Sequence, residues 1–401
     1  MQKSFPGCHR IAMVDDNSLY SKKLMEALRQ KGANCVLYGP RHSPRSKSQG
    51  VMEIPERSAI RVWSQNRFPF QVFLRAVRDR PQFVHFQFEF YGIHSYGPLY
   101  SALWLPLALL FLRPLTIRTI VTLHMIFPRD KRLAVIRDTS PSTRRFPIIL
   151  LAAFLIFWYK TVSILSHSLV VHANVFKNRL EEDYKVKPSR IAVIPHGVDT
   201  FGGGYEEPEV NLGPESKDML YFGVISPRKG LETLIAAYAL IVGKANCNLL
   251  LAGETPPYYK GYNDELKTFA ERLELGPNLQ FLGRVSAKDA HKLFRAARFV
   301  VLPYIYDMSA SGSLSWALGH GVPVVASRTD YFGEELSHEK FGLLVPPGEP
   351  EALAKAMAKM LEEESMVRRF AERSRQVGLA RSWSIIAART LEFYGTLVSK
   401  P

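Results

Sequence analysis

The segment LPYIYDMSASGSLSWALGHGVPVVAS, residues Leu302 to Ser327, decides the fold of this chain. It runs as a buried strand, a turn rich in serine and glycine, a helix and a second buried strand. The free backbone N–H groups and the dipole at the start of such a helix point at whatever lies above the turn. Ser309, Ser311 and Ser313 add hydroxyl donors around Gly312. The pattern predicts a seat for a phosphate or diphosphate, although a turn that only caps the helix would have the same sequence.

The length and composition indicate a folded, soluble protein with two domains. A chain of 401 residues is too long for one ordinary core, and its 47% hydrophobic and 22% charged residues are typical of globular proteins. Three widely separated cysteines, Cys8, Cys35 and Cys247, show no metal-ligand spacing, so we expect reduced thiols in a cytoplasmic protein. The first residues, MQKSFPGCHRIAMVDD, lack the apolar core of a signal peptide, and we expect no export.

Positive charge is concentrated in the first half of the chain. Residues 1–200 contain 29 Lys and Arg against 13 Asp and Glu, whereas residues 201–401 contain 23 against 24. A half so basic suits an anionic partner, which is a nucleic acid, a membrane surface or a phosphorylated substrate. The basic residues are scattered and form no recognised nucleic-acid motif, which disfavours the first of these partners.

Two uncharged apolar runs lie within the basic half, at 99–112 and 146–159. Each has 14 residues, and a membrane-spanning helix needs about 20, so they are either buried core helices or segments that lie in a membrane interface. Cationic and aromatic residues accompany both runs: Trp104, Arg113, Arg144, Arg145, Trp158, Tyr159 and Lys160. These residues favour peripheral contact with an anionic membrane surface.

Short strands alternate with helical segments along the chain. Residues 10–39 read as a β-α-β unit whose helix is capped by Asn17 or Ser18. Further apolar segments of strand character lie at 83–86, 119–123, 169–172, 191–194, 219–224, 248–252, 279–282, 299–303, 323–326 and 342–345. Such alternation predicts parallel sheets covered on both faces, and we expect two doubly wound, Rossmann-like α/β domains.

The segment 201–217, FGGGYEEPEVNLGPESK, predicts a linker because it is rich in glycine, proline and acid. It separates an N-terminal domain, 1–200, from a C-terminal domain, 218–381. The amphipathic segment 382–401 predicts a closing helix, which we expect to return to the N-terminal domain. Ligands of open parallel sheets bind beyond the carboxyl ends of the strands, so we expect the functional site in a cleft between two facing sheets.

The segment FGVISPRKG, 222–230, places Arg228 and Lys229 between a strand and a helix. A planar guanidinium and a compact ammonium at this point can together neutralise a diphosphate and the charge that develops on a leaving nucleotide.

Several segments resemble one family in order and spacing. FGVISPRKG, LLLAGE, LQFLGRV, SASGSLSWALGHGVPVVAS and FGLLVPPGEPEALAKAM are similar to the nucleotide-sugar domain of the family-four retaining glycosyltransferases, the glycosyl transferases group 1, which have the GT-B fold. VTLH at 121–124 and IPHGVD at 194–199 resemble the N-terminal half of that family. The likeness is strong over residues 167–360 and weak over the first 120.

The resemblance implies a sugar transferase. The donor would be a nucleotide-diphosphate sugar bound by the C-terminal domain, with no further cofactor. The acceptor would be a saccharide on the N-terminal domain, and transfer would retain the anomeric configuration. From the basic charge and the two apolar runs we further expect a saccharide or lipid-linked saccharide acceptor in surface-glycan assembly. Because the sequence shows no acidic cluster with magnesium spacing, we expect Lys229, Arg228 and the helix at Gly312 to act without a metal.

The resemblance also assigns catalytic positions. Lys229 matches the family's diphosphate-binding lysine, and Arg228 replaces an arginine whose position here is Val224. His124 matches a histidine near the donor sugar, although a structural histidine at a strand end stays a second interpretation. Of the two positions of the family's Glu-x7-Glu motif, the first falls on Asp307.

The second position of that motif falls on Ser315, which has no carboxylate to bind a ribose. We therefore expect the donor to be bound by the two loops: Gly253, Glu254, Ser309, Ser311, Gly312, Ser313 and Ser315. Asp15, Asp16 and Glu89, at the ends of predicted strands, are weaker candidates for acceptor contacts.

Three other functions stay open from the sequence. A nucleotide-sugar epimerase or a disaccharide phosphorylase can be built from the same two sheets, and a non-catalytic scaffold subunit would explain the missing glutamate at Ser315. A nucleic-acid-binding protein is the third, and the scattered basic residues disfavour it.

Overall fold

The computed structural model describes residues 10–15, 18–40, 59–63, 67–90, 98–130, 133–134, 137, 144, 146–200, 218–242, 247–339 and 341–398. The chain forms two compact units. Unit 1 contains Met1–Gly197 and Trp383–Pro401, and unit 2 contains Val198–Ser382. The expected linker, 201–217, lies outside the described residues.

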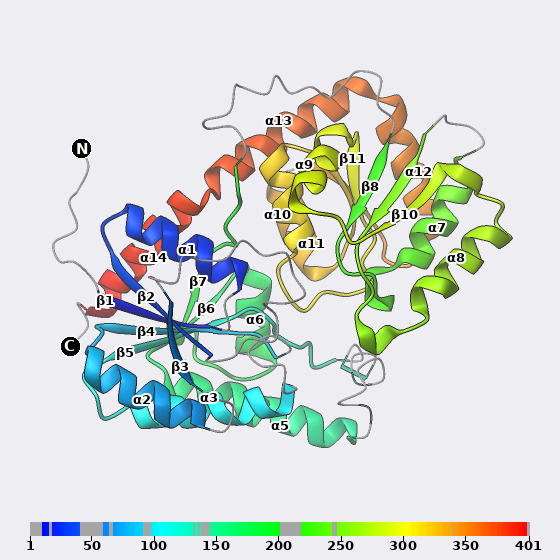
Figure 1. Ribbon diagram of the computed structural model, residues 1–401. Helices are drawn as coiled ribbons and strands as arrows, with labels where there is room; N and C mark the ends of the chain where they lie inside the picture. Colours follow the sequence, from blue (N-terminus) through cyan, green and yellow to red (C-terminus); the bar gives the residue numbers. More distant parts are fainter. Residues whose placement is uncertain are drawn as a thin grey trace. The chain divides into compact units, whose positions relative to one another are not determined.

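Unit 1 is built on a parallel sheet of seven strands in the order β3-β2-β1-β4-β5-β6-β7 (Figure 1). The strands are β1 (Arg10–Val14), β2 (Asn34–Pro40), β3 (Ala59–Trp63), β4 (Phe83–Phe88), β5 (Arg118–Leu123), β6 (Ser168–Val171) and β7 (Ile191–Val193). The helices are α1 (Leu19–Gln30), α2 (Phe68–Asp79), α3 (Pro98–Leu112), α5 (Ile148–Leu165), α6 (Asn174–Glu182) and α14 (Trp383–Val398). Helices α1 and α14 cover one face of the sheet, and α2, α3 and α5 cover the other.

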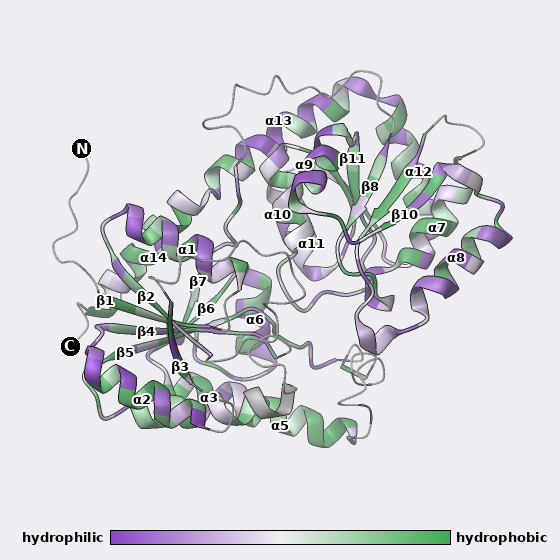
Figure 2. Ribbon diagram, in the orientation of Figure 1, coloured by the Kyte–Doolittle hydropathy of each residue, from purple (hydrophilic) through white to green (hydrophobic). Residues whose placement is uncertain are grey.

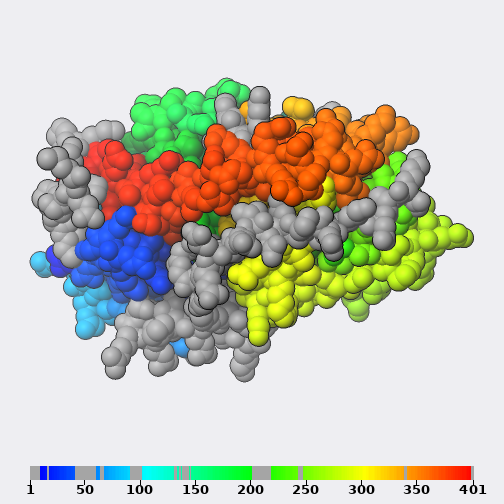
Figure 3. Space-filling view, turned by 90° about the horizontal axis from the view of Figure 1, so that it is seen from above, coloured from blue at the N-terminus to red at the C-terminus, as the bar shows by residue number. Residues whose placement is uncertain are grey.

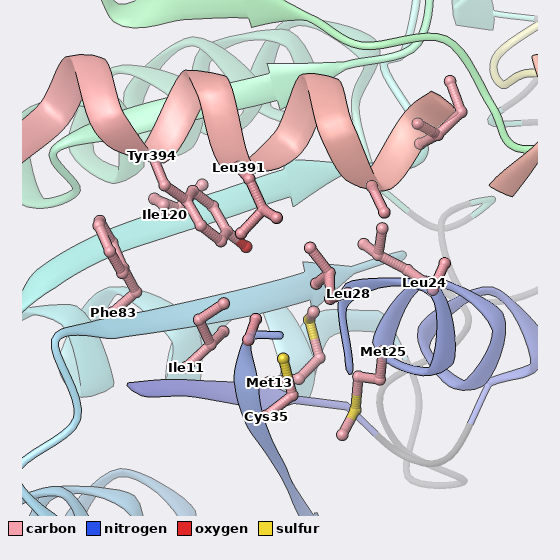
Figure 4. Close-up of a cluster of buried hydrophobic side chains, with 14 of the residues drawn as sticks. Ile11, Met13, Leu24, Met25, Leu28, Cys35, Phe83, Ile120, Leu391 and Tyr394 are labelled. Atoms are coloured by element: carbon pink, nitrogen blue, oxygen red, sulfur yellow. The ribbon is translucent and has the colours of Figure 1, made fainter. Parts of the chain in front are cut away.

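The closing helix α14 is a structural part of unit 1. It lies beside α1 (Figure 3), and its side chains Leu391 and Tyr394 enter a buried cluster with residues of α1, β1, β4 and β5 (Figure 4). The Tyr394 ring stacks on Phe83 with a centroid distance of 4.6 Å. Its hydroxyl lies 2.6 Å from Nδ1 of the buried His85.

Unit 2 contains a parallel sheet of six strands in the order β10-β9-β8-β11-β12-β13. The strands are β8 (Met219–Phe222), β9 (Leu249–Ala252), β10 (Leu279–Gly283), β11 (Phe299–Leu302), β12 (Val324–Ser327) and β13 (Gly342–Val345). The helices are α7 (Leu231–Ala239), α8 (Tyr262–Arg272), α9 (Ala287–Ala296), α10 (Gly312–His320), α11 (Asp330–Glu339), α12 (Pro350–Glu362) and α13 (Glu364–Ala380).

Both sheets reverse their strand order once, between β1 and β4 in unit 1 and between β8 and β11 in unit 2. Two doubly wound α/β units are therefore present, as the sequence predicts. In such sheets the loops on either side of the reversal separate and leave room for a ligand. The segment Leu302–Ser327 runs from the end of β11 through α10 and β12, and it forms one side of the reversal in unit 2.

The buried His85 makes the stability of unit 1 depend on pH. Its Nε2 lies 2.7 Å from Thr122 Oγ1, and burial, with a smaller contribution from His172, lowers its pKa from 6.5 to about 3. As the pH falls, His85 is therefore protonated in the unfolded state before it is protonated in the folded state. The stabilisation is complete above pH 6.5 and is lost as the pH falls toward 3.

We predict that His85→Gln flattens this dependence. Between pH 6.5 and 4, the variant's free energy of unfolding should fall less steeply than that of the wild type, by up to about 1.4 kcal/mol per pH unit. Urea titrations followed by tryptophan fluorescence measure both slopes. Tyr394→Phe is the control, since it removes one hydrogen bond, worth about 1 kcal/mol, and leaves the imidazole in place; equal slopes for wild type and His85→Gln would contradict the prediction.

Candidate functional site

The loops that follow β8 and β11 pack directly against each other at the strand reversal of unit 2. Gly230, in the first loop, has φ +67°, and a Cβ at this position would lie 2.0 Å from the carbonyl oxygen of Pro303 in the second. The backbone N–H of Ile305 donates to the carbonyl oxygen of Arg228 at 2.9 Å. Only glycine permits this approach, which fixes Arg228 and Lys229 beside the end of β11.

A second glycine contact brings the loop after β9 to the same place. A Cβ on Gly253 would lie 1.7 Å from the carbonyl oxygen of Gly223. A Cβ on Gly223, whose φ is +145°, would lie 2.8 Å from Ser313 Oγ. Gly253 therefore serves the packing of two loops, and Gly223 lies against the first turn of α10.

Lys229 is buried at the centre of these loops, with 7% of its surface exposed. Its Nζ lies 3.4 Å from the centroid of the Tyr304 ring, where the negative face of the ring attracts a cation. Burial holds the pKa of the ammonium well below its ordinary value, the neighbouring Arg228 lowers that pKa further, and Asp307 opposes the shift. An anion bound here would offset both the cost of burying the ammonium and its repulsion by Arg228.

Tyr304 connects Lys229 to the start of α10. Its hydroxyl lies 3.1 Å from Ser311 Oγ and 3.3 Å from Ser313 Oγ. The lysine, one aromatic ring and two serines thus form one buried network. Tyr304 is not among the site residues predicted from the sequence, although its place directly after a buried strand, next to Pro303, marks a residue at the carboxyl edge of the sheet.

The N-terminus of α10 is open at Gly312. Ser311 is the N-cap, and its Oγ accepts a hydrogen bond from the backbone N–H of Leu314 at 3.2 Å. Within the described parts of the chain, no hydrogen bond engages the N–H of Gly312 or Ser313. Apart from its chain neighbours and the backbone of its own helix, none of the described residues has an atom within 4 Å of the position that a Cβ on Gly312 would take. Two donors and a helix dipole therefore face unfilled space.

Asp307 is buried and supports a neighbouring helix. Its exposed fraction is 2%, and Oδ2 accepts a hydrogen bond from the backbone N–H of Tyr331 at 2.9 Å. Tyr331 lies in the first turn of α11, so the carboxylate binds the positive end of that helix. Its influence on the pKa of Lys229 also places its charge near the ammonium.

The other residues that we predict to bind the sugar donor lie in different surroundings. Ser315 Oγ donates to the carbonyl oxygen of Ser311, four residues earlier, at 3.4 Å, which is the usual bond of a serine within a helix. Glu254 is exposed, and its Oε2 lies 3.9 Å from Arg284 Nη1; its carbonyl oxygen accepts the N–H of Ile225. Ser309 is half-buried.

In unit 1, His124 follows β5 and is hydrogen-bonded through both ring nitrogens. Its Nδ1 lies 3.0 Å from Nε2 of His172, and its Nε2 lies 2.9 Å from Oε1 of Gln87. Nδ1 of His172 lies 2.9 Å from the carbonyl oxygen of Ile194. Burial lowers the pKa of His172 to about 3, and burial together with the neighbouring imidazoles holds the pKa of His124 well below its ordinary value.

The tautomers of this pair follow from counting protons. The Ile194 carbonyl oxygen requires a proton on Nδ1 of His172, so the neutral ring accepts from His124 Nδ1–H through its Nε2. Nε2 of His124 then has no proton and needs a donor. An amide's oxygen and nitrogen are assigned from their bonding partners. In this structure Gln87 Nε2 donates to Met13 Sδ at 3.0 Å, so Gln87 can donate to His124 only by turning its NH₂ group and giving up the bond to the sulfur.

Aromatic rings surround the imidazole pair. The Tyr20 ring, from α1, lies with its centroid 4.7 Å from that of His124, 5.3 Å from that of His172 and 5.1 Å from that of His196. Trp383 of α14 lies 5.2 Å from Tyr20. Of these three histidines, only His124 was predicted from the sequence as a site residue. His172 and His196 also follow strands of the same sheet, and this common position could have identified them.

Asp15 and Glu89, two of the weaker acceptor candidates, lie at the strand reversal of unit 1. Asp15 follows β1 and is buried, and its Oδ2 accepts from the N–H of Ser18 at 2.9 Å and from the Ser18 hydroxyl. It therefore supports the start of α1. Glu89 follows β4 and is half-buried, whereas Asp16 lies outside the described residues.

Comparison with known proteins identifies the family. The model of the glycosyl transferases group 1 matches residues 206–377, and the model of glycosyltransferase family 4 matches residues 19–200. The chain belongs to the family-four, group 1 glycosyltransferases. One family model matches each half of this glycosyltransferase family member, and the two matches confirm the resemblance seen in its motifs.

Curated relatives match part of the chain. A phosphatidyl-myo-inositol mannosyltransferase of Mycolicibacterium smegmatis is 28% identical over 207 residues, which is 51% of this chain and 51% of that protein. A D-inositol 3-phosphate glycosyltransferase of Corynebacterium glutamicum is 24% identical over 254 residues, or 59% and 60%. The chain spans about half the length of the curated relatives it matches.

Solved structures match nearly the whole chain and confirm the GT-B fold of this family member. A sucrose-phosphate synthase of Thermosynechococcus elongatus has a TM-score of 0.73 at 19% identity and covers 98% of this chain and 100% of its own. HepE of Anabaena, solved in complex with UDP and glucose, has a TM-score of 0.72 at 17% identity, with 97% and 100% covered.

We predict that Lys229→Met does not destabilise the unliganded protein and raises its free energy of unfolding by on the order of 1 kcal/mol. A buried charge is replaced by an apolar chain of similar length. The stability of the wild type should also rise with pH toward 10.5, because the unfolded lysine binds its proton more tightly. Chemical denaturation at pH 7 and pH 9.5 tests both statements.

Lys292→Met is the matched control for this substitution. Lys292 is exposed and forms a surface ion pair with Asp289, so its replacement should change stability by less than about 1 kcal/mol. A Lys229→Met variant that unfolds more readily than the wild type at both pH values would show that the ammonium stabilises the folded protein.

Proposed function

We propose that the protein is a retaining hexosyltransferase that moves a sugar from a nucleotide-diphosphate sugar to a saccharide or lipid-linked saccharide in surface-glycan assembly. One observation carries the proposal: the buried Lys229 is joined through Tyr304 to Ser311 and Ser313 at the open N-terminus of α10. A buried cation beside free N–H donors is an arrangement for a compact dianion. HepE, a structural neighbour solved in complex with UDP and glucose, is consistent with such a donor.

In the proposed reaction the nucleoside diphosphate leaves while the sugar gains positive charge at its anomeric carbon. Lys229, Arg228 and the first N–H groups of α10 stabilise the negative charge on the departing diphosphate. The acceptor hydroxyl forms the new bond to the anomeric carbon on the face that the leaving group vacates, which gives retention, and its proton passes to the departing diphosphate. These cations supply the electrostatic stabilisation that a divalent ion supplies elsewhere, so we propose that neither a metal nor a further cofactor is needed.

We assign acceptor binding to unit 1 and propose that the protein works in the cytoplasm at the inner face of the cell membrane. The support is the basic composition of residues 1–200, which suits an anionic surface, and the relative that is named a phosphatidyl-myo-inositol mannosyltransferase.

Product analysis separates transfer from the alternatives of the same fold. We predict that the protein releases free nucleoside diphosphate from a nucleotide sugar only when an acceptor is supplied, and that EDTA leaves the rate unchanged. A panel of nucleoside diphosphates selects the donor first, because a ligand at 100 times its Kd stabilises the native state by about 2.7 kcal/mol. Epimerised nucleotide sugar, sugar phosphate made from inorganic phosphate, or the absence of any turnover would contradict transfer.

We predict that Gly312→Ala raises the KM for the donor at least about tenfold and leaves stability intact. The added methyl meets no protein atom, and an alanine in the first turn of a helix is favourable by about 0.5 kcal/mol, but the methyl occupies the proposed diphosphate seat. Steady-state kinetics and thermal unfolding provide the two readouts.

Gly333→Ala is the matched control for Gly312→Ala at the proposed diphosphate-binding site. It also lies in a helix, α11, where a Cβ would have open space, and it should leave the KM unchanged. If Gly312→Ala retains the wild-type KM, the donor does not approach the N-terminus of α10.

A further inference from the structure

Helices α2, α3 and α5 form a continuous layer over one face of the sheet of unit 1 (Figure 1). Helix α3 packs between the other two. Trp158 of α5 donates its indole N–H to the carbonyl oxygen of Ala102 in α3 at 2.5 Å. The rings of Phe73 in α2 and Phe111 in α3 have centroids 6.3 Å apart. The outer side chains of the three helices therefore belong to one surface.

Helix α5 turns large apolar side chains away from the protein. Ile149, Leu150, Phe157 and Ile164 are 77%, 60%, 69% and 60% exposed. Positions 149, 153, 157, 160 and 164 are all exposed, and this spacing of three or four residues places them along one side of a helix. The opposite side packs inward through Leu155, Trp158, Tyr159 and Val162. The exposed side chains are thus a stripe, and they recur over the whole helix.

The neighbouring helices extend this stripe into a patch. Figure 2 colours α5 hydrophobic over most of its length. The exposed large apolar residues of the three helices are Phe70, Leu74, Val77, Leu103, Leu107, Leu110, Phe111, Ile149, Leu150, Phe157 and Ile164, and we call them the α2–α3–α5 face. Single exposed apolar residues are common on soluble proteins, but a patch contributed by three adjacent helices marks an interaction surface.

Positive charge accompanies the face. Exposed cations lie within or beside the three helices: Arg67, Arg78, Arg80, Arg113, Arg144 and Lys160. Asp79 is the only acidic residue in the sequences of α2, α3 and α5. Its Oδ2 lies 2.6 Å from Arg75 Nε and 2.8 Å from the Tyr38 hydroxyl. An apolar surface bordered by cations complements a bilayer whose headgroups are anionic.

We propose that the α2–α3–α5 face docks the protein onto an anionic membrane surface, with the three helices lying in the plane of the interface. The exposed apolar side chains enter the region between headgroups and acyl chains, and the cations meet lipid phosphates. Lys160, in the middle of the α5 stripe, extends its ammonium toward the headgroups while its methylene chain stays with the apolar residues. The proposal deepens the proposed membrane location by naming the surface that contacts the lipid.

Interfacial binding fits α5 better than a transmembrane position. Among the described residues, α5 is one helix that is long and apolar enough to cross a membrane, and 28% of its 18 residues are buried in the protein. However, it connects β5 to β6 of a parallel sheet, and its inner side is bonded to α3. Insertion across a bilayer would expose Trp158, Tyr159 and the sheet that they cover.

Vesicle flotation of the full chain tests the face. We expect binding to vesicles of phosphatidylglycerol and phosphatidylcholine that is at least about tenfold stronger than binding to phosphatidylcholine alone, and that weakens as salt is added. Ile149→Glu and Phe157→Glu should each lower the partition about tenfold or more, since each removes one apolar side chain from the interface. Lys160→Glu should lower it for anionic vesicles only.

Leu240→Glu and Leu379→Glu are the matched controls. Both leucines are exposed in unit 2, at 48% and 44%, and their replacement should leave vesicle binding unchanged. Equal binding to neutral and anionic vesicles, or equal losses in both sets of variants, overturns the proposal. So does a shift from dimer to monomer on Phe157→Glu in vesicle-free sedimentation, because the face would then join two copies of the chain.

Thermal stabilisation of Phe157→Glu by nucleoside diphosphates is the separate readout for the transferase proposal. Lost vesicle binding with unchanged nucleotide binding supports the docking surface. Wild-type protein that floats with vesicles but binds no nucleoside diphosphate overturns the transferase and leaves the membrane face intact.

Discussion

The contact between the ammonium of Lys229 and the face of Tyr304 is the interaction on which the candidate site depends. A buried cation is costly unless other groups compensate it. Here the ring, together with the charge of Asp307, offsets part of this cost, while Arg228 adds to it. The remaining imbalance is a reason for an anion to bind, since a diphosphate would supply the charge that the fold lacks. The same ring bonds to Ser311 and Ser313, so the cation and the helix N-terminus are held as one unit.

Backbone contacts keep this network in place. The loops after β8, β9 and β11 approach so closely that Gly230 and Gly253 have no room for an ordinary side chain, and at Gly223 a φ of +145° favours glycine. Gly312 differs from them because it has open space around it. Packing does not require a glycine at the N-terminus of α10, which Tyr304 joins to Lys229; under the proposed function a ligand would occupy this space. Packing therefore accounts for some of the glycines in these three strand-end loops, and the proposed function accounts for Gly312.

The sequence predicted the fold well because its information is periodic. Alternating strands and helices, with Leu302–Ser327 as the clearest unit, led to two Rossmann-like sheets, and the apolar run at 146–159 became α5, which continues to Leu165. The site was harder to predict because it depends on which side chains face each other. Tyr304 went unrecognised, since nothing in the sequence tells which ring lies over Lys229. Ser315 is a second example: its hydroxyl donates to the carbonyl oxygen of Ser311, four residues earlier, and its contact with the sugar donor stays a prediction.

The two units prepare their strand ends for opposite kinds of chemistry. Unit 2 holds a cation and free N–H donors, whereas unit 1 holds the neutral pair His124 and His172, with His172 fixed by the Ile194 carbonyl oxygen. This fixed tautomer leaves Nε2 of His124 as an acceptor. To bind a sugar hydroxyl, Nε2 of His124 would have to give up its hydrogen bond to Gln87. It would then accept a hydrogen bond from the hydroxyl. A protonated His124 would donate instead, but burial and three neighbouring imidazoles, those of His172, His196 and His85, oppose that charge. Under the proposed function we therefore expect His124 to accept and orient a hydroxyl rather than to supply a proton.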